Sequence, residues 1–409
     1  MITELTKGVY WVGVVDWGLR RFHGHELSTH RGSTYNAYLI VDEKIALVDT
    51  VWGPFQDQLI ANIREVVDPA KIDFVIANHA EVDHAGSLPA VMRAAPQATV
   101  VVSKRGRESV EGHFHQPWSF KAVQTGDKIS LGSCELVFIE APMLHWPDSM
   151  FTYVAGKGIL MPNDAFGQHY ATAFRFNDQV DQEELYEEAL KYYANILTPF
   201  SDLVTKKITE VLALNLPVEI IAPSHGVIWR RSPASIVEAY RRWASGEAKE
   251  RVVIAYETMW GSTEKMARAL AEGVADEGVE ALLRGLPMAD RTDVVKELLE
   301  AKGLLMGSST HNQHMLLNIA ALVEDLKGLR FTRKIGAAFG SYGWAGTAVG
   351  HLEESLREAG FDVIVSDLAF RWAPSAADLE RAREFGRRFA REVRQALSQP
   401  VAAHHGPEA

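Results

Sequence analysis

The residues most suited to chemistry cluster in one short stretch, 76–88, which reads I-A-N-H-A-E-V-D-H-A-G-S-L. Four potential metal ligands, His79, Glu81, Asp83 and His84, fall within it, directly after the strand-like apolar run 74–76. Imidazole and carboxylate donors suit iron, zinc or manganese, and four such donors exceed what one catalytic ion usually takes. Taken by itself, the stretch could also be a polar loop with two incidental histidines.

Three further candidates follow downstream: His145, Asp164 and His225. Each comes after a strand-like apolar run, at 136–139, 159–161 and 219–222. A strand end provides a rigid base from which a loop residue can face open space. Singly, each is more typical of a turn residue or a hydrogen-bonded histidine than of a ligand. Together with the first cluster they form a set that is natural for two ions sharing one carboxylate.

A second candidate site lies in the other half of the chain, where 257–263 reads E-T-M-W-G-S-T between a strand-like run and a helix-like run. Its hydroxyls and Gly261 surround an expected helix N-terminus, which favours a phosphate group. Both G-K-[ST] and G-x-G-x-x-G are absent from it, so a mononucleotide such as FMN fits better than ATP or a dinucleotide. The alternative is an ordinary helix cap.

Two more loops favour the nucleotide. Residues 307–312 read G-S-S-T-H-N and residues 340–346 read G-S-Y-G-W-A-G, and each follows a strand-like run. Ligands of open α/β sheets bind at the carboxyl ends of the strands, where all three loops are expected. Trp260, Tyr342 and Trp344 could flank a flat isoalloxazine ring.

The order of the elements predicts two domains, which the length of 409 residues also favours. Residues 1–248 read as strands with interspersed helices, typical of an α/β sandwich of two sheets flanked by helices. Residues 249–398 alternate strictly between strand and helix, which predicts a doubly wound parallel sheet of five strands, the last at 361–365. The tail, 399–409, lacks periodicity and is expected to be mobile.

Composition narrows the partners. The net charge of −11 disfavours nucleic acid and anionic membranes. Neither a signal peptide nor a membrane-spanning apolar run is recognisable, so a cytoplasmic location is expected. The single cysteine, Cys134, excludes a disulfide framework and any four-cysteine metal site within the chain.

The ligand pattern His79-x-Glu81-x-Asp83-His84, His145, Asp164, His225 resembles the binuclear iron site of the flavodiiron proteins, also called A-type flavoproteins. The resemblance extends over nearly the whole chain. It implies a metallo-β-lactamase-like αββα sandwich followed by a flavodoxin-like domain. Related zinc hydrolases of this fold carry a histidine where Glu81 stands, and an anionic oxygen donor there favours a harder, redox-active metal such as iron.

The resemblance also implies roles for individual residues. His79, Glu81 and His145 would hold one iron, Asp83, His84 and His225 the other, and Asp164 would bridge them. His23 and Tyr193 match residues of the family that could hydrogen-bond a metal-bound oxygen or hold a water, with a structural hydrogen bond as the alternative for each. His25 and His169 are weaker candidates. The residues expected to contact FMN lie in the three loops: Thr258, Met259, Trp260, Gly261, Ser262, Thr263, Ser308, Thr310, Asn312, Ser341, Tyr342, Gly343 and Trp344.

The implied activity is reduction of O2 to water, of NO to N2O, or of both. Two irons and FMN together store four electrons, enough for O2, while two electrons suffice for a pair of NO molecules. Because the chain lacks the cysteines of a fused rubredoxin, a separate electron donor such as rubredoxin is expected. The family arrangement also implies a head-to-tail homodimer, or a pair of such dimers, in which the flavin of one subunit meets the iron site of the other.

Two alternatives remain open from the sequence. One is a dizinc hydrolase of the metallo-β-lactamase fold with an FMN-binding domain, since zinc can occupy many imidazole and carboxylate sites. The other is an FMN electron carrier whose metal domain is inactive. The sequence does not rank O2 against NO, because the family shares its ligand set between the two substrates.

Overall fold

The computed structural model describes residues 2–24 and 26–398, which form two compact units. The first unit contains the chain up to Tyr193 and the segment Phe200–Ser245, and the second contains Ala194–Pro199 and the chain from Gly246 onward. The predicted tail, 399–409, and the weak candidate His25 lie outside the described residues. The sequence places the domain boundary between 248 and 249, and that position remains a prediction.

The first sheet of unit one has seven strands in the order β1-β2-β7-β8-β9-β10-β11. They are β1 (Thr3–Thr6), β2 (Val9–Trp11), β7 (Tyr38–Val41), β8 (Ile45–Val48), β9 (Ile72–Ile76), β10 (Thr99–Ser103) and β11 (Phe120–Val123). Strands β8 to β11 run parallel to one another. The strand-like run that was predicted before His79 is therefore confirmed as β9, an interior strand of this sheet.

The second sheet has five strands in the order β12-β13-β14-β15-β16. They are β12 (Lys128–Ser130), β13 (Glu135–Glu140), β14 (Met150–Ala155), β15 (Ile159–Met161) and β16 (Ile220–Ile221). Strand β14 is antiparallel to both neighbours and β15 is parallel to β16, so β13, β15 and β16 all run in one direction. Their carboxyl ends, which precede His145, Asp164 and His225, therefore point to the same edge of the sheet.

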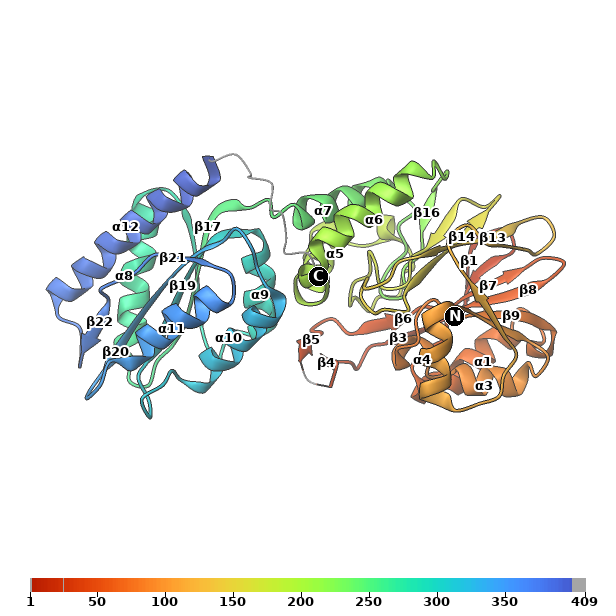
Figure 1. Ribbon diagram of the computed structural model, residues 1–409, viewed down its shortest axis with the longest axis horizontal. Coiled ribbons are helices and arrows are strands. Elements are labelled where there is room, and N and C mark those ends of the chain that lie inside the picture. The colour runs from red at the N-terminus through yellow and green to blue at the C-terminus, as the bar shows by residue number, and fades with distance from the viewer. Residues whose placement is uncertain (1, 25, 399–409) are drawn as a thin grey trace. The chain divides into compact units, whose positions relative to one another are not determined.

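Two short ladders complete the strands of this unit. They pair β3 (Val14–Asp16) with β6 (Ser33–Tyr35), and β4 (Arg21–Phe22) with β5 (Leu27–Ser28). The helices are α1 (Gln56–Arg64), α2 (Val82–Ala85), α3 (Leu88–Ala94), α4 (Lys104–Phe114), α5 (Gln182–Tyr192), α6 (Ser201–Ala213) and α7 (Ala234–Ala244). Figure 1 shows α1, α3 and α4 beside the sheet that contains β9, and α6 and α7 near β16.

The two sheets of the first unit share one apolar core. Ile76 and Val101 from the first sheet belong to the same buried cluster as Phe138, Val154 and Met161 from the second. Side chains from the inner faces of two packed sheets interdigitate in this way when helices cover the outer faces. The predicted αββα sandwich is thus confirmed, and its packing fixes the two sheet edges from which the ligand loops emerge.

The second unit is a doubly wound sheet with every pair of neighbouring strands parallel. Its strands are β17 (Lys249–Glu257), β18 (Glu280–Gly285), β19 (Ala301–Ser309), β20 (Ile335–Tyr342), β21 (Asp362–Val363) and β22 (Ala369–Arg371), in the order β18-β17-β19-β20-β21, with β22 also pairing with β20. This order is that of flavodoxin-like sheets, which confirms the predicted fold class.

Among the described residues of this unit, five helices cover the two faces of the sheet. They are α8 (Ser262–Asp276), α9 (Arg291–Glu300), α10 (Leu317–Leu329), α11 (Thr347–Glu358) and α12 (Ala376–Ser398). In Figure 1, α8 lies against α12 on one face, and α10 lies against α11 on the other. Within the described residues, no helix has the length and apolar composition needed to cross a membrane.

The fifth strand differs from its predicted span, 361–365. Only β21 is regular there, and the chain then loops out before rejoining β20 at β22. The Ile364 amide still donates to Gly336 O, and the Gly340 amide donates to Leu368 O, so the ladder is interrupted between these two bonds rather than ended. This interruption brings a fourth loop, after β22, to the carboxyl edge of the sheet.

Candidate metal and flavin sites

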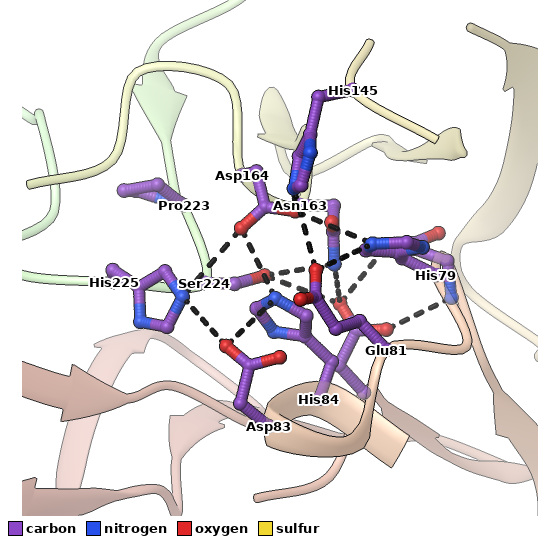
Figure 2. Close-up of polar contacts among 12 residues, drawn as sticks. His79, Glu81, Asp83, His84, His145, Asn163, Asp164, Pro223, Ser224 and His225 are labelled. Atoms are coloured by element: carbon purple, nitrogen blue, oxygen red, sulfur yellow. Dashed lines mark hydrogen bonds and ion pairs between the residues drawn. The ribbon is translucent and has the colours of Figure 1, made fainter. Parts of the chain in front are cut away.

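The seven candidate ligands converge in the structure although they come from four separate loops. His79 and Glu81 lie in the extended loop after β9, and Asp83 and His84 lie on the one-turn helix α2 that follows. Their ligand atoms form two groups whose members lie within 4.8 Å of one another: His79, Glu81, His145 and Asp164, and then Asp83, His84 and His225. Figure 2 shows these side chains pointing toward a common centre.

Asp164 lies between the two groups and faces both. Its Oδ2 is 3.4 Å from His145 Nε2 and 3.9 Å from His79 Nε2. Its Oδ1 is 3.0 Å from His84 Nε2 and 3.5 Å from His225 Nε2. One carboxylate that presents one oxygen to each of two imidazole pairs has the arrangement that a bridging ligand requires.

The remaining carboxylates complete each group. Glu81 Oε2 is 3.2 Å from His79 Nε2 and 3.4 Å from His145 Nε2. On the other side, Asp83 Oδ2 is 3.1 Å from His225 Nε2 and 3.3 Å from His84 Nε2. Each group therefore combines two imidazole nitrogens with one carboxylate, besides the shared Asp164.

Several of these buried atoms lack any hydrogen-bond partner despite their short mutual distances. They are both carboxylate oxygens of Asp83, Asp164 Oδ2, His84 Nε2 and His225 Nε2. A buried polar atom without a partner is costly and rare in folded proteins. Here the lone pairs converge on points between the side chains rather than on each other, so the donor set fits metal cations.

Neighbouring groups fix which nitrogen of His79 and of His225 faces the cluster. His79 Nδ1 donates to Asp148 Oδ1 at 3.0 Å, and Asp148 Oδ2 accepts the Ala80 amide at 2.8 Å. His225 Nδ1 donates to Thr34 O at 2.7 Å. With Nδ1 protonated and hydrogen-bonded, Nε2 faces the cluster with its lone pair, which can bind a metal, as in other histidine metal sites.

Asp49 connects three of the ligand loops from behind. Its Oδ1 accepts the Asn78 amide at 2.8 Å, and its Oδ2 lies 3.3 Å from Asn163 Nδ2 and 3.5 Å from Ser224 Oγ. Asn78, Asn163 and Ser224 immediately precede His79, Asp164 and His225 in the chain. One buried carboxylate thus sets the relative positions of three ligands, a role that the sequence analysis missed.

The electrostatics of the cluster are those of a cation site. Burial lowers the pKa of His79, but hydrogen bonds to Asp148 and Glu81 outweigh burial and raise that pKa to about 10. Burial raises the pKa of Asp164, yet the nearby charges of His84 and His145 hold that pKa well below its usual range. Protons and metal cations compete for such ligands, so metal affinity is expected to fall as the pH falls.

Of the two predicted accessory residues, only one reaches the cluster. His23 Nε2 lies 3.1 Å from Glu81 Oε1, and the neighbouring Phe22 ring packs against His225. Tyr193, in contrast, places its hydroxyl 3.0 Å from Ser201 Oγ. The hydroxyl that donates to Asp164 Oδ1, at 2.8 Å, belongs to the neighbouring Tyr192, which was not predicted, and the role of Tyr193 stays a prediction.

His169, a weaker candidate, is buried beside the cluster. Its Nδ1 lies 2.8 Å from Ser33 Oγ, and its ring centroid lies 5.0 Å from that of His225. Burial and the neighbouring charge of His225 hold the pKa of His169 well below the usual value. His169 therefore forms a neutral part of the wall around the ligands.

The second unit contains a cavity of about 840 Å³ at the carboxyl edge of its sheet. That size lies within the range of small-molecule and cofactor sites. Its lining includes nine of the predicted flavin residues: Met259, Trp260, Ser262, Thr310, Asn312, Ser341, Tyr342, Gly343 and Trp344. It also includes Ser309, His311, Gln313, Ala345, Trp372 and Ala373, which were not predicted as contacts. None of the lining residues is an aspartate, glutamate, lysine or arginine.

The other four predicted residues, Thr258, Gly261, Thr263 and Ser308, do not line the cavity, but they shape the loops that do. Gly261 adopts φ +84° and its amide donates to Thr258 Oγ1 at 3.0 Å, which shapes the turn into α8. Ser308 Oγ donates to Ser309 O at 2.8 Å and accepts the Leu316 amide at the same distance, so it holds its own loop. A left-handed φ is readily adopted only by glycine, which explains the residue type at 261.

Three hydroxyl groups from three loops meet under the cavity. Thr263 Oγ1 lies 3.0 Å from Ser309 Oγ and 2.9 Å from Ser341 Oγ. The adjacent N-terminus of α8 has no side-chain cap, whereas Glu257 Oε2 accepts amides at the start of α10. Free amides, a helix dipole and convergent hydroxyls at one place fit a phosphate monoester.

The fold and the two sites define a class of protein in which a metallo-β-lactamase-like domain with a two-cation cluster precedes a flavodoxin-like domain with a cofactor cavity. Comparison with known proteins agrees with both parts. The family model described as ODP family beta lactamase matches residues 34–226, and the flavodoxin model matches residues 254–386.

The chain is 52% identical to a nitric oxide reductase from Moorella thermoacetica, over 95% of this chain and 98% of that protein. It is 47% identical to the anaerobic nitric oxide reductase flavorubredoxin of Escherichia coli, over 96% of this chain and 82% of that protein. The structure of rubredoxin oxygen:oxidoreductase from Desulfovibrio gigas superposes with a TM-score of 0.95 at 38% identity, covering 98% of this chain and all of that one. The chain therefore belongs to the flavodiiron protein family and is an oxidoreductase.

Proposed function

We propose that this oxidoreductase reduces NO to N2O, O2 to water, or both, at a binuclear iron site that receives electrons from FMN. The observation that carries this proposal is the position of Asp164, with one oxygen toward each of two His/His/carboxylate groups. A hydrolytic site with one metal ion, or a purely structural site, would not need a second set of ligand atoms without hydrogen-bond partners beside the first. The names of the relatives from Moorella thermoacetica and Desulfovibrio gigas support NO and O2 as candidate substrates.

In this proposal His79, Glu81 and His145 would hold one iron, Asp83, His84 and His225 would hold the other, and Asp164 would contribute to both. When bound, the irons and FMN would together supply the four electrons needed to reduce O2 with four protons to two waters, or the two needed to reduce two NO with two protons to N2O and water. Glu81 supplies an oxygen donor where zinc hydrolases of this fold carry nitrogen, which supports iron.

The surrounding residues orient the site and restrict water. Tyr192 donates to Asp164 Oδ1 and so fixes the orientation of the carboxylate between the two groups. His23, on the turn after Phe22, contacts Glu81 and lies 6.2 Å, ring to ring, from His145. His23 is positioned to donate a hydrogen bond to an oxygen at this edge of the cluster, while Phe22 covers His225 with an apolar ring.

FMN is the proposed occupant of the cavity in the second unit. The hydroxyls of Thr263, Ser309 and Ser341, with the N-terminus of α8, would hold its phosphate, and the aromatic residues of the lining would contact its ring system. Trp260 and Trp344 are each 92% exposed. Such large exposed aromatic groups are typical of protein interfaces, and they support the head-to-tail homodimer expected from the family.

We further propose a cytoplasmic protein that receives electrons from a separate donor such as rubredoxin. The name of the relative from Desulfovibrio gigas, rubredoxin oxygen:oxidoreductase, supports rubredoxin as that donor. Analytical ultracentrifugation tests the dimer: a monomer that retains both cofactors and full turnover would contradict the head-to-tail arrangement.

The deciding experiment compares NO and O2 consumption by the anaerobically reduced protein, measured in parallel with gas electrodes. We expect consumption of at least one gas at a rate that depends on added reductant. Stoichiometric zinc with esterase activity and no gas consumption would favour the hydrolase alternative. Unchanged gas consumption in His79→Ala would favour the electron carrier, because that variant removes an iron ligand but leaves the flavin domain intact.

A further inference from the structure

A fourth loop lines the flavin cavity besides the three that carry the predicted contacts. It follows β22 and contributes Trp372 and Ala373 to the lining. Because the sheet edge is re-formed by β22 after the interruption of β21, this loop lies next to the loop that carries Tyr342 and Gly343. Neither the sequence motifs nor the comparisons assign a role to Trp372.

The backbone of Trp372 is held in an unfavourable conformation. Its φ is +64°, in the left-handed region that bulky residues avoid. The Trp372 amide donates to Tyr342 O at 2.7 Å, which ties the residue to the end of β20. Local strain of this kind persists where surrounding contacts enforce it, and it is concentrated at functional sites.

The indole ring is fixed from two sides. A Cβ on Gly343 would lie 3.0 Å from the six-membered ring of Trp372, so the glycine at this position allows the ring to approach the backbone. The Arg371 guanidinium lies 5.3 Å from the indole centroid, and Arg371 Nε donates to Gly343 O at 3.0 Å. The ring is therefore preorganised although it is not buried.

Packing within the protein does not account for this arrangement. Trp372 remains 60% exposed, and it borders a cavity whose lining contains no Asp, Glu, Lys or Arg. If the indole were buried, its packing would explain both the strained backbone of Trp372 and the glycine at position 343. The indole is not buried. A flat apolar ligand in the cavity would cover the exposed face and account for both.

We propose that Trp372 is a flavin-binding residue that forms the fourth wall of the cavity and contacts the ring system of FMN. This inference rests on the proposed FMN function of the cavity and adds a residue to it. Aromatic contacts of this type contribute about tenfold in affinity beyond the apolar area that they bury.

The test is FMN titration of the full-length protein after its flavin has been removed, followed by flavin fluorescence. The key variant is Trp372→Gly, because glycine adopts φ +64° without strain. Trp372→Phe retains an aromatic ring. Val365→Ala is the matched control, since Val365 is 58% exposed in the same unit but does not line the cavity.

We expect the dissociation constant of FMN to rise about tenfold in Trp372→Gly, by less than about threefold in Trp372→Phe, and not at all in Val365→Ala. The melting temperature of flavin-free Trp372→Gly should equal or exceed that of the parent. Parent-like FMN affinity in Trp372→Gly would overturn the inference, as would a lowered melting temperature, which would assign Trp372 a structural role. Failure of the parent protein to bind FMN would instead overturn the proposed function itself.

Discussion

The metal cluster and the flavin cavity differ in burial and in the charge of the residues that form them. The ligands of the cluster are titratable groups, most of them buried, and three of them are held by a further hydrogen bond: His79 to Asp148, His225 to Thr34 and Asp164 to Tyr192. The flavin cavity is open and its lining carries no Asp, Glu, Lys or Arg, so hydroxyls, backbone amides and exposed aromatic rings do the binding. Charges in a low-dielectric interior must be preorganised or they destabilise the fold, whereas neutral groups near water tolerate looser placement.

The comparison predicts that the largest effect comes from the residue shared by both metal groups. Asp164→Asn removes the carboxylate that faces both pairs of histidines. We expect metal affinity to fall by more than about 100-fold, beyond the usual cost of changes outside the ligand shell. Metal analysis after dialysis checks this, with the exposed Asp178→Asn as control. Retention of two metals per chain would contradict the bridging role.

Asp49→Asn tests whether metal binding depends on the fixed positions of the ligand loops, as the comparison of the two sites predicts. The amide would place a donor against the donors of Asn78 and Asn163, displacing the loops that carry His79 and Asp164. Chelator competition should show metal affinity lower by about 10- to 100-fold, with FMN affinity unchanged. Asp73→Asn is the matched control, because Asp73 also accepts a backbone amide, that of Ile45, but lies at no ligand loop. An equal effect of both variants would contradict the role of Asp49.

Thr263→Val tests the neutral site in the same way. It removes one of the three hydroxyls that meet beside the N-terminus of α8. A hydrogen bond to a charged phosphate contributes enough that FMN affinity should fall about tenfold, while metal content stays the same. Titration of flavin-depleted protein measures this, and Thr205→Val on α6 serves as control. Weaker metal binding in Thr263→Val would show that the two sites are not independent.

The smallest expected effect separates two adjacent tyrosines. Tyr192→Phe removes the hydrogen bond to Asp164, and metal affinity should fall by less than about tenfold. Tyr193→Phe removes a contact to Ser201 and should lower the free energy of unfolding by about 1 kcal/mol without affecting the metals. Chelator competition and thermal unfolding distinguish the two. A larger loss of metal affinity in Tyr193→Phe would support the role that the sequence predicts for Tyr193.

The features that could be predicted from the sequence are those that depend on a local pattern of residues. Buried strands are recognisable as apolar runs in the sequence. The loops after β9, β13, β15 and β16 carry histidines and carboxylates, and the repetition of this pattern after four strands indicates that these residues act together. The strict strand–helix alternation likewise placed the three predicted flavin loops at one sheet edge.

The residues that the sequence did not predict depend on the rotation of a side chain around a helix or on contacts between segments that are far apart in the chain. Tyr192 and Tyr193 are about 100° apart around a helix, and the pair K-Y-Y contains no information on which hydroxyl faces Asp164. Asp49 and Asp148 act through loops far away in the chain, so no spacing reveals them. Trp372 was overlooked because the predicted last strand ended at 365, whereas β22 resumes the ladder at Ala369.

The central claim is that the chain stores electrons both at two irons held around Asp164 and at FMN. Anaerobic reductive titration of the oxidised, iron-loaded protein, followed by absorbance and electron paramagnetic resonance, counts them directly. We predict uptake of four electrons per chain, two by the flavin and two by the metal pair. Uptake of only two, all of them accounted for by flavin bleaching, would contradict the account.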